Sequence, residues 1–460
     1  MYERIFPTWF MGGFECASHV GRARRRLDLI ASTRHDRFVR QDYARLRGLG
    51  MRAARDGVRW HLVEARPGRY DFSGVRPMLR AARDEGITVI WDLLHYGLPD
   101  GLDPFSAEFV ERFRRFAAAF VELAGAEAGA APFVSPVNEI SFFAWSAGDQ
   151  GNFFPYGRGR GDELKRQLAR AAIAACAAAR AVDPRTRLVH TDPLIHVAAD
   201  ERRPEDRAAA EGYGRLQFAA WDMIAGRACP ELGGSPAYLD VVGVNYYINN
   251  QWVYPGGAGT TLEPTHPSYR PLSALLAEAY ARYRRPLLLA ETGIEGEARG
   301  RWLRYVGREA RDALRAGVDL QGLCLYPVVN HPGWDDDRHC HNGLWGYPDE
   351  SGDRSAFEPL ARELERQTVF FDRRLAGREV DEPDRFAIGE LRLGAAARHM
   401  ADVSSHRDGD ERGAEPAAPR PETCPPPAAA PPLRRPAGPG VAAPAFISDA
   451  GRGARFEEDD

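Results

Sequence analysis

The chain has 460 residues, with 61 Lys and Arg residues against 65 Asp and Glu residues and a formal net charge of -4. It has no excess of basic residues to neutralise a phosphate backbone, so nucleic acid is not an expected partner. Hydrophobic residues make up 44% of the sequence, which is enough for a large core, and the length fits two or three small domains or one large barrel.

The sequence predicts neither a membrane segment nor a secretion signal. The longest Ala-rich stretch, 171–182, contains Arg180 and is too short to cross a bilayer, and the N-terminus lacks a charged segment followed by an apolar one. The six cysteines form no Cys-x-x-Cys pair, so we expect reduced thiols and no thiolate zinc site. We therefore expect a cytoplasmic protein with no membrane partner, and we leave its oligomeric state open.

Short apolar runs rich in Val, Ile and Leu alternate with longer stretches of helical periodicity, and the alternation repeats about eight times. The predicted strands, in chain order, are Trp9–Glu15, Ala53–Trp60, Thr88–Asp92, Phe133–Asn138, Arg187–Asp192, Val241–Asn245, Leu287–Glu291 and Leu320–Tyr326. The predicted helices include Val39–Leu49, Val75–Asp84, Glu108–Leu123, Glu163–Val182, Tyr213–Ile224, Leu272–Tyr283 and Arg301–Ala316. Parallel βα units in this number predict an α/β chain folded as a single (β/α)₈ barrel.

An open doubly wound sheet is the alternative fold. It would place a Gly-rich phosphate turn after the first strand, but Gly12-Gly13 lacks the G-x-G-x-x-G spacing. We expect the barrel over residues 1–375 and a helical or irregular extension over 376–400. A disordered low-complexity tail is expected over 401–460, where Pro and Ala dominate between 416 and 445.

Two carboxylates directly follow apolar strands. Glu139 comes after 133–138 at the predicted fourth strand, and Glu291 comes after 287–290 at the predicted seventh. In a closed barrel these strand ends lie across the mouth from each other, so both carboxylates can reach one bound molecule. Glycoside hydrolysis needs such a pair, one as a protonated acid and the other as nucleophile or as base for water. The alternative is that each Glu only pairs with an Arg at the barrel rim.

The segments around both residues resemble clan A glycoside hydrolases. Ser135–Ile140 is similar to the Asn-Glu motif at their fourth strand, and Leu288–Gly293 is similar to their nucleophile motif at the seventh. Three further segments resemble family 1, the β-glucosidase family. Leu94–Pro99 is similar to its His-Trp-Asp-Leu-Pro segment, Val242–Tyr247 to its Gly-x-Asn-Tyr-Tyr segment, and Gly322–Trp334 to its strand-eight segment. The order of these motifs makes the resemblance specific.

The resemblance implies a retaining β-glycosidase that hydrolyses a small β-glucoside or related β-glycoside by double displacement, with no cofactor or metal. Glu139 is then the general acid/base, and Glu291 is the nucleophile that forms a covalent glycosyl-enzyme. The residues implied to surround the substrate are Asn138 at the sugar 2-hydroxyl, Arg55 and Tyr247 at Glu291, and His19, His95, Asn245, Tyr326, Trp334 and Asp335 around the sugar. Contacts from Arg55 and Tyr247 are expected to lower the pKa of Glu291, while burial and a second negative charge raise that of Glu139.

The chain departs from the family pattern at two places. Gly333 stands where the family has a Glu that grips the sugar 4- and 6-hydroxyls, and one of Asp335–Asp337 could supply a carboxylate instead, so the glycone is left open. The first strand also differs, which indicates a divergent branch. Glu15 in that strand is either a third active-site carboxylate or a rim charge paired with Arg55.

Two groups of residues near the predicted strand ends have alternative interpretations. His190 and Asp192 at the fifth strand either touch the substrate or cap the strand. Phe142, Phe143 and Trp145 after Glu139 form either an aromatic entrance for an aglycone or the packing of a long loop.

Other functions remain as alternatives. A transglycosidase would use the same covalent intermediate, and a carbohydrate-binding barrel would have lost turnover. A metal-dependent hydrolase is a third alternative. His339-Cys340-His341 fits a loop turn better than a zinc site, because adjacent side chains point in different directions.

Overall fold

A computed structural model gives the structure of the chain, and it describes residues 3–257, 259–334, 336 and 338–375. The predicted extension over 376–400 and the predicted tail over 401–460 lie outside the described residues. No helix among the described residues is long and apolar enough to cross a membrane. The cytoplasmic location stays a prediction.

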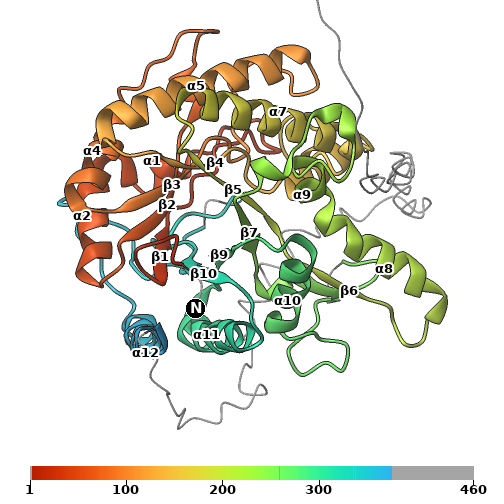
Figure 1. Cartoon of the computed structure of the whole chain (residues 1–460). Coiled ribbons are helices and arrows are strands. Elements are labelled where there is room, and N and C mark those ends of the chain that lie inside the picture. Colours follow the sequence, from red (N-terminus) through yellow and green to blue (C-terminus); the bar gives the residue numbers. More distant parts are fainter. Residues whose placement is uncertain (1–2, 258, 335, 337, 376–460) are drawn as a thin grey trace, which may run out of the picture. The chain divides into compact units, whose positions relative to one another are not determined.

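Eight parallel strands close into a barrel, which confirms the predicted (β/α)₈ fold (Figure 1). In order around the ring these strands are β1 (Phe10–Gly13), β2 (Ala53–Gly57), β3 (Thr88–Asp92), β4 (Phe133–Ser135), β5 (Arg187–Pro193), β7 (Val241–Asn245), β9 (Leu287–Thr292) and β10 (Leu320–Leu325). β1 pairs with both β2 and β10, so the ring has no free edge. Each predicted strand overlaps one of these eight.

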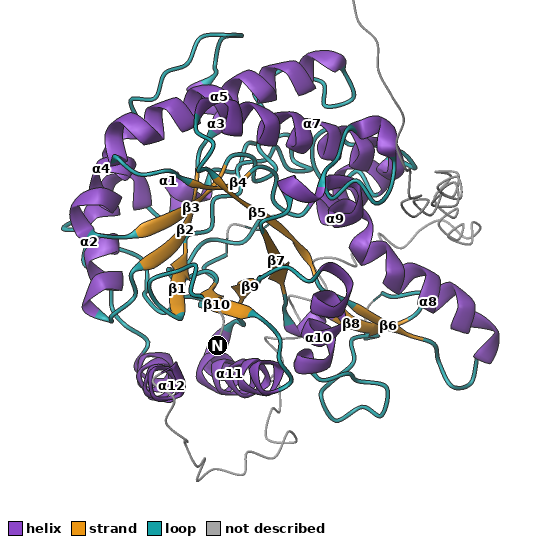
Figure 2. Cartoon of the chain, in the orientation of Figure 1, coloured by secondary structure: helices purple, strands orange, loops and turns teal. Residues whose placement is uncertain are grey.

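Helices surround the strands (Figure 2). They are α1 (Leu29–Ser32), α2 (His35–Gly48), α3 (Trp60–Val63), α4 (Arg76–Glu85), α5 (Ala107–Ala128), α6 (Ile140–Phe143), α7 (Gly161–Val182), α8 (Arg207–Arg215), α9 (Ala219–Ile224), α10 (Leu272–Tyr283), α11 (Arg299–Arg315) and α12 (Glu358–Leu375). The single helix predicted over 213–224 is wrong, because α8 and α9 are separate and a 3₁₀ turn lies between them. Gly212 and Gly214 weaken the helix just before that turn.

The helix α5 illustrates how sequence fixes these elements. It begins after Ser106, whose hydroxyl accepts a hydrogen bond from the amide of Phe109 at 3.2 Å and so caps the helix. Gly129 follows its C-terminus in a left-handed conformation with φ of 68°. The spacing of three and four residues between its aromatic side chains puts them on one buried face, formed by Phe109, Phe113, Phe116 and Phe120.

The barrel interior changes from apolar to polar toward the carboxyl ends of the strands. A buried apolar cluster fills the barrel with Phe6, Met11, Ala53, Ile90, Val189, Val241, Leu288, Ala290, Cys324 and Tyr326. The strand ends and the residues just after them instead bury polar groups, among them Arg55, Asp92, Asn138 and Glu291. This is the end of the barrel at which (β/α)₈ enzymes carry their active sites.

A second, smaller sheet lies outside the barrel. β6 (His196–Ala198) and β8 (Gln251–Val253) pair in parallel, and they come from the loops that follow β5 and β7. Neither strand is predicted from the sequence, since three residues are too few to show an alternating pattern.

The cysteines differ in state. Cys16, Cys176, Cys324 and Cys340 carry free thiols and are buried, as the sequence predicts. Cys229 is disulfide-bonded, so the expectation of reduced thiols is wrong at that residue.

Candidate active site

Glu139 follows β4 and directly precedes the short helix α6. Its backbone is left-handed, with φ of 48° and ψ of 61°, a conformation that costs a residue with a side chain roughly 1–2 kcal/mol. The Glu139 amide donates a hydrogen bond of 2.9 Å to the Thr191 carbonyl of β5, which holds the backbone in place. The local strain therefore sets the direction of one carboxylate.

The Glu139 carboxylate has two neutral hydrogen-bond donors. Tyr96 donates its hydroxyl to Oε2 at 2.6 Å, and Asn245 donates its amide to Oε1 at 2.9 Å. Burial raises the pKa of Glu139, the hydrogen bonds from Tyr96 and Asn245 lower it, and the charge of Asp192 raises it, with a raised pKa as the net result. No Arg pairs with Glu139 among the described residues, so the rim ion pair considered for it is not formed.

Glu291 lies within β9 and is 5% exposed. Arg55 donates to its Oε1 at 2.5 Å, and the Tyr247 hydroxyl donates to its Oε2 at 2.8 Å. Burial raises the pKa of Glu291 to about 7, with Arg55 opposing the rise and Glu139 adding to it. The expectation of a lowered pKa is therefore wrong, because burial outweighs the donors.

Arg55 in β2 is fully buried and contacts three of the polar residues at the strand ends. Its Nε and Nη2 donate to the two oxygens of Asp92 at 3.0 and 2.7 Å. Nη2 also donates to Asn138 Oδ1 at 2.6 Å, and Nη1 reaches Glu291. A planar guanidinium with several fixed donors can hold this arrangement, whereas a lysine ammonium could not.

Asn138 connects the two sides of the site. Its Oδ1 accepts from Arg55 and, at 3.3 Å, from Asn245, the residue that also donates to Glu139. Glu139 and Glu291 are therefore joined through Asn245, Asn138 and Arg55, and their charges act on each other. The two predicted carboxylates belong to one site.

The Asn138 amide nitrogen is also fully used. It lies 3.0 Å from His95 Nε2 and 3.0 Å from the Tyr96 hydroxyl. It can donate to His95 Nε2 only while that nitrogen carries no proton, which leaves Nδ1 to donate to Asp92 at 3.0 Å. Burial lowers the pKa of His95, but Glu15 and Asp92 outweigh it and the pKa is raised. A sugar hydroxyl at Asn138 would have to replace one of these two contacts.

Rings form a wall beside the carboxylates. The His19 ring lies 4.9 Å from that of Trp334 and 4.6 Å from that of Phe153. Trp334 also lies 5.7 Å from Tyr96 and 6.3 Å from Phe142. The aromatic wall, as we call it, therefore consists of His19, Tyr96, Phe142, Phe153 and Trp334. Burial lowers the pKa of His19 to about 3, so this ring stays neutral.

The remaining predicted residues differ in position. Tyr326 is 1% exposed in the barrel core, and its ring centre lies 5.2 Å from the Arg55 guanidinium, so its ring packs beside Arg55. Asp335 lies outside the described residues, as does Asp337. Asp336 is described and lies 3.4 Å from Arg338, so its carboxylate is already paired.

The residues for which the sequence left alternatives make the following contacts. His190 is buried, and its Nε2 donates to the Tyr238 carbonyl at 2.9 Å. Asp192 accepts from the Ser141 amide at 3.0 Å and hydroxyl at 2.7 Å, so it caps the turn that begins α6. Burial raises the pKa of Asp192 to about 7. Phe143 is fully buried packing, whereas Phe142 belongs to the aromatic wall.

One group of side chains has metal-ligand chemistry among the described residues. The ligand atoms of Cys16, Asp92 and His95 lie within 4.8 Å of one another. Hydrogen bonding accounts for this proximity, since Cys16 Sγ lies 3.1 Å from His95 Nδ1 and 3.6 Å from Asp92 Oδ2. Both oxygens of Asp92 already accept from Arg55, whose charge takes the place that a cation would need. These residues do not fit a metal.

Two residues that support the catalytic candidates were not predicted from the sequence. Asp92 holds Arg55 and His95, and Tyr96 donates to Glu139. The role of Tyr96 could have been found from the sequence. Tyr96 stands where the family segment has Trp, and the change to Tyr adds a hydroxyl group.

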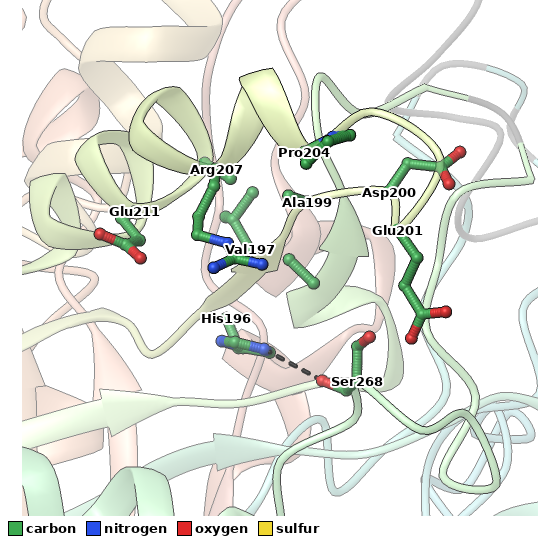
Figure 3. A pocket seen from close by; sticks show the side chains of 11 residues that line it. His196, Val197, Ala199, Asp200, Glu201, Pro204, Arg207, Glu211 and Ser268 are labelled. Carbon is green, nitrogen blue, oxygen red and sulfur yellow. Dashed lines mark hydrogen bonds between the residues drawn. The ribbon is translucent and has the colours of Figure 1, made fainter.

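One cavity in the described part of the chain lies away from these residues (Figure 3). It measures about 340 Å³ and lies beside β6 and α8, with His196, Glu201, Arg207, Glu211 and Ser268 among its lining residues. The His196 ring is turned to the Ser268 carbonyl at 3.1 Å, and Asp200 pairs with Arg202. The charged groups that line this cavity are thus paired with neighbours or exposed. Among its described lining residues, no group of polar side chains points together toward one bound molecule.

No family model and no curated protein matches the chain. Solved structures do. A family 1 β-glucosidase from Thermotoga maritima matches with a TM-score of 0.63 and 16% identity, over 80% of this chain and 98% of its own. A β-glucosidase from Thermotoga maritima in complex with glucoimidazole matches with a TM-score of 0.66 and 15% identity, over 79% of this chain and 99% of its own. The AHE enzyme from Alicyclobacillus herbarius matches with a TM-score of 0.64 and 19% identity, over 80% of this chain and 100% of its own. The chain shares the fold of these enzymes.

Proposed function

We propose that the protein is a retaining β-glycosidase, with Glu139 as general acid/base and Glu291 as nucleophile. Its substrate is a small β-glucoside or a related β-glycoside. The observation that carries the proposal is the single hydrogen-bonded network through Arg55, Asn138 and Asn245 that joins these two carboxylates at the mouth of the barrel. The fold shared with β-glucosidases supports it.

The environments of the two carboxylates support these roles. Only Glu291 has a cationic donor, Arg55, whereas the donors to Glu139 are neutral. When the pair holds one proton, the negative charge therefore resides on Glu291 and the proton on Glu139. A protonated acid and an ionised nucleophile are what the first step requires.

In the first step an oxygen of Glu291 bonds to the anomeric carbon while the bond to the aglycone oxygen breaks. Glu139 gives its proton to that leaving oxygen. Arg55 and Tyr247 fix the two oxygens of Glu291, so the nucleophile needs little reorganisation.

In the second step water attacks the anomeric carbon of the glycosyl-enzyme. The charge of Glu291 is absent in this intermediate, which lowers the pKa of Glu139 and lets it take a proton from the water. The bond between the sugar and Glu291 then breaks, and both carboxyl groups return to their starting states.

Chromogenic aryl β-glycosides with different glycones test the proposal. We expect Glu291→Gly to abolish turnover. Added azide should restore turnover of this variant, with a glycosyl azide as the product. Glu139→Gln should slow substrates with poor leaving groups by about 10²–10⁴-fold and those with good leaving groups much less. Glu309→Gln is the matched control, since Glu309 is 3% exposed and accepts from Ser273 outside the barrel.

The same assays separate the alternative functions. If no glycone is cleaved and azide rescues nothing, hydrolysis is not the activity. Sugar binding that survives Glu139→Gln, with no rate in either form, would identify a carbohydrate-binding barrel. Product analysis with added acceptor sugars distinguishes a transglycosidase, because it yields a new glycoside in place of free sugar. Full activity in the presence of a chelator excludes a metal-dependent hydrolase.

A further inference from the structure

Glu15 is a third carboxylate at the mouth of the barrel, and neither step of the proposed reaction uses it. It follows β1 closely and is 7% exposed. The Ala17 amide donates to its Oε1 at 2.9 Å, and His95 Nε2 lies 3.5 Å from the same oxygen. It does not form the rim pair with Arg55 that the sequence left open, because Arg55 donates to other acceptors.

The second oxygen of Glu15 is unpaired. Among the described residues no donor reaches Oε2, although the side chain is more than nine-tenths buried. A carboxylate oxygen can only accept, so Oε2 takes its hydrogen bond from water or from a bound molecule. Oε2 is not one of the fully enclosed unpaired atoms, so it is within reach of solvent, and a hydroxyl of a bound molecule can take the place of water as its donor.

Other observations place this oxygen beside the bound molecule. The charge of Glu15 acts on Glu291, Tyr247 and Tyr96, which surround the reacting position. Buried polar atoms of two further residues, His19 Nδ1 and Asn245 Oδ1, also have no partner in the described part of the chain.

We infer that Glu15 accepts a hydrogen bond from a ring hydroxyl of the glycone and so makes the site selective for a neutral sugar. The inference rests on the proposed glycosidase function and adds the substrate class to it. Within the described residues of the loop after β10, the acidic candidate Asp336 is paired with Arg338. Glu15 then supplies a sugar-gripping carboxylate from the opposite end of the sequence.

The charges of the site exclude an anionic glycone. Glu15, Asp92 and Glu291 bring three carboxylates together, and the cation Arg55 is already shared by Asp92 and Glu291. A uronic acid or a sugar phosphate would add like charge beside these carboxylates, while Arg55 is already engaged by Asp92 and Glu291.

The test is a deoxy-sugar series built on the glycone that the wild-type enzyme prefers. In the wild type, removing the hydroxyl that Glu15 binds should lower kcat/KM by about 10- to 100-fold, the range for a hydrogen bond to a charged group. In Glu15→Ala this penalty should shrink to less than about twofold at that one position and persist at the others. Glu15→Gln should keep part of it, because the amide oxygen still accepts.

Glu309→Gln, which removes a buried carboxylate elsewhere, should leave every penalty unchanged. If Glu15→Ala lowers kcat/KM equally for all sugars of the series, Glu15 has only an electrostatic or structural role, and the inference is overturned. So would preferential turnover of a β-glucuronide or a 6-phosphoglycoside.

Dissociation constants of the unreactive methyl β-glycosides, with the same deoxy series, make the result independent of turnover. A position-specific loss in binding without any hydrolysis would refute the proposed function and still support the role of Glu15. Absence of all sugar binding would refute both.

Discussion

Tyr96 donates a hydrogen bond of 2.6 Å to Glu139, and both residues have left-handed backbones, with φ of 63° and 48°. Each conformation is strained for a residue with a side chain, so neighbouring groups must hold it. Asn138 joins the segments that carry these two residues, because its backbone amide donates to the Leu94 carbonyl and its side chain lies 3.0 Å from the Tyr96 hydroxyl. The position of the proposed acid is therefore set jointly by the segments that follow β3 and β4.

Replacing Tyr96 by Phe removes the donor to Glu139 and leaves the ring in the aromatic wall. That hydrogen bond lowers the pKa of Glu139, so its loss should raise the pKa. The alkaline limb of kcat/KM, where the acid loses its proton, should move up by about one pH unit, the equivalent of one charge-assisted hydrogen bond. Tyr156→Phe is the control, because the Tyr156 hydroxyl donates only to the Val20 and Gly21 carbonyls. An unmoved or lowered alkaline limb would contradict this assignment.

Replacing Asp192 by Asn should move the same limb in the opposite direction. The charge of Asp192 raises the pKa of Glu139, and Asp192 itself is ionised only above its own pKa of about 7. Neutralising it should therefore lower the pKa of Glu139 and shift the alkaline limb down, with little change below pH 7. Asn still accepts from Ser141 and preserves the cap. The comparison is a full pH profile of both proteins, and a shift to higher pH would refute the electrostatic role.

Arg55→Lys should damage both stability and catalysis. One ammonium cannot serve both oxygens of Asp92 together with Asn138 and Glu291, so a buried carboxylate loses its partner. We expect the free energy of unfolding to fall by about 3–5 kcal/mol, as for other broken buried ion pairs. We also expect kcat/KM to fall by at least about 100-fold, since the nucleophile loses its cation. Arg112→Lys, at a buried Arg that pairs with Glu64, should destabilise the protein and leave kcat unchanged.

Glu291→Gln should stabilise the protein, and more so at higher pH. The pKa of Glu291 is raised from 4.5 to about 7, so the folded state binds more protons than the unfolded state between these values. Wild-type stability therefore falls as pH rises through this window, and the variant escapes the loss. The gain should be near zero at pH 4.5 and about 3 kcal/mol at pH 8, given 1.4 kcal/mol per pKa unit. Urea unfolding at both pH values measures it, and a variant less stable at pH 8 would contradict the sign.

The barrel was predictable because its strands are buried on both faces and therefore appear as continuous apolar runs. The same pattern put Glu139 and Glu291 at strand ends, where a carboxylate interrupts the run. The three-residue strands β6 and β8 were not predictable, since their pairing is with each other across distant loops.

The electrostatics of the site were less accessible. Donor residues near Glu291 could be identified from the sequence, but the extent of burial could not, and burial decides the direction of its pKa. The left-handed backbone of Tyr96 is likewise invisible in residue types, because it follows from contacts with Asn138 rather than from local propensity.

Arg55 has a further consequence for assembly of the chain. It lies on β2 and touches Asp92 on β3, Asn138 after β4, and Glu291 on β9, so its partners span both halves of the ring. A fragment ending before β9 would bury this guanidinium with one counterion missing. Cleavage of the backbone between β5 and β7 should therefore yield halves that gain order only on meeting each other, which makes ring closure and formation of the reaction centre a single cooperative event.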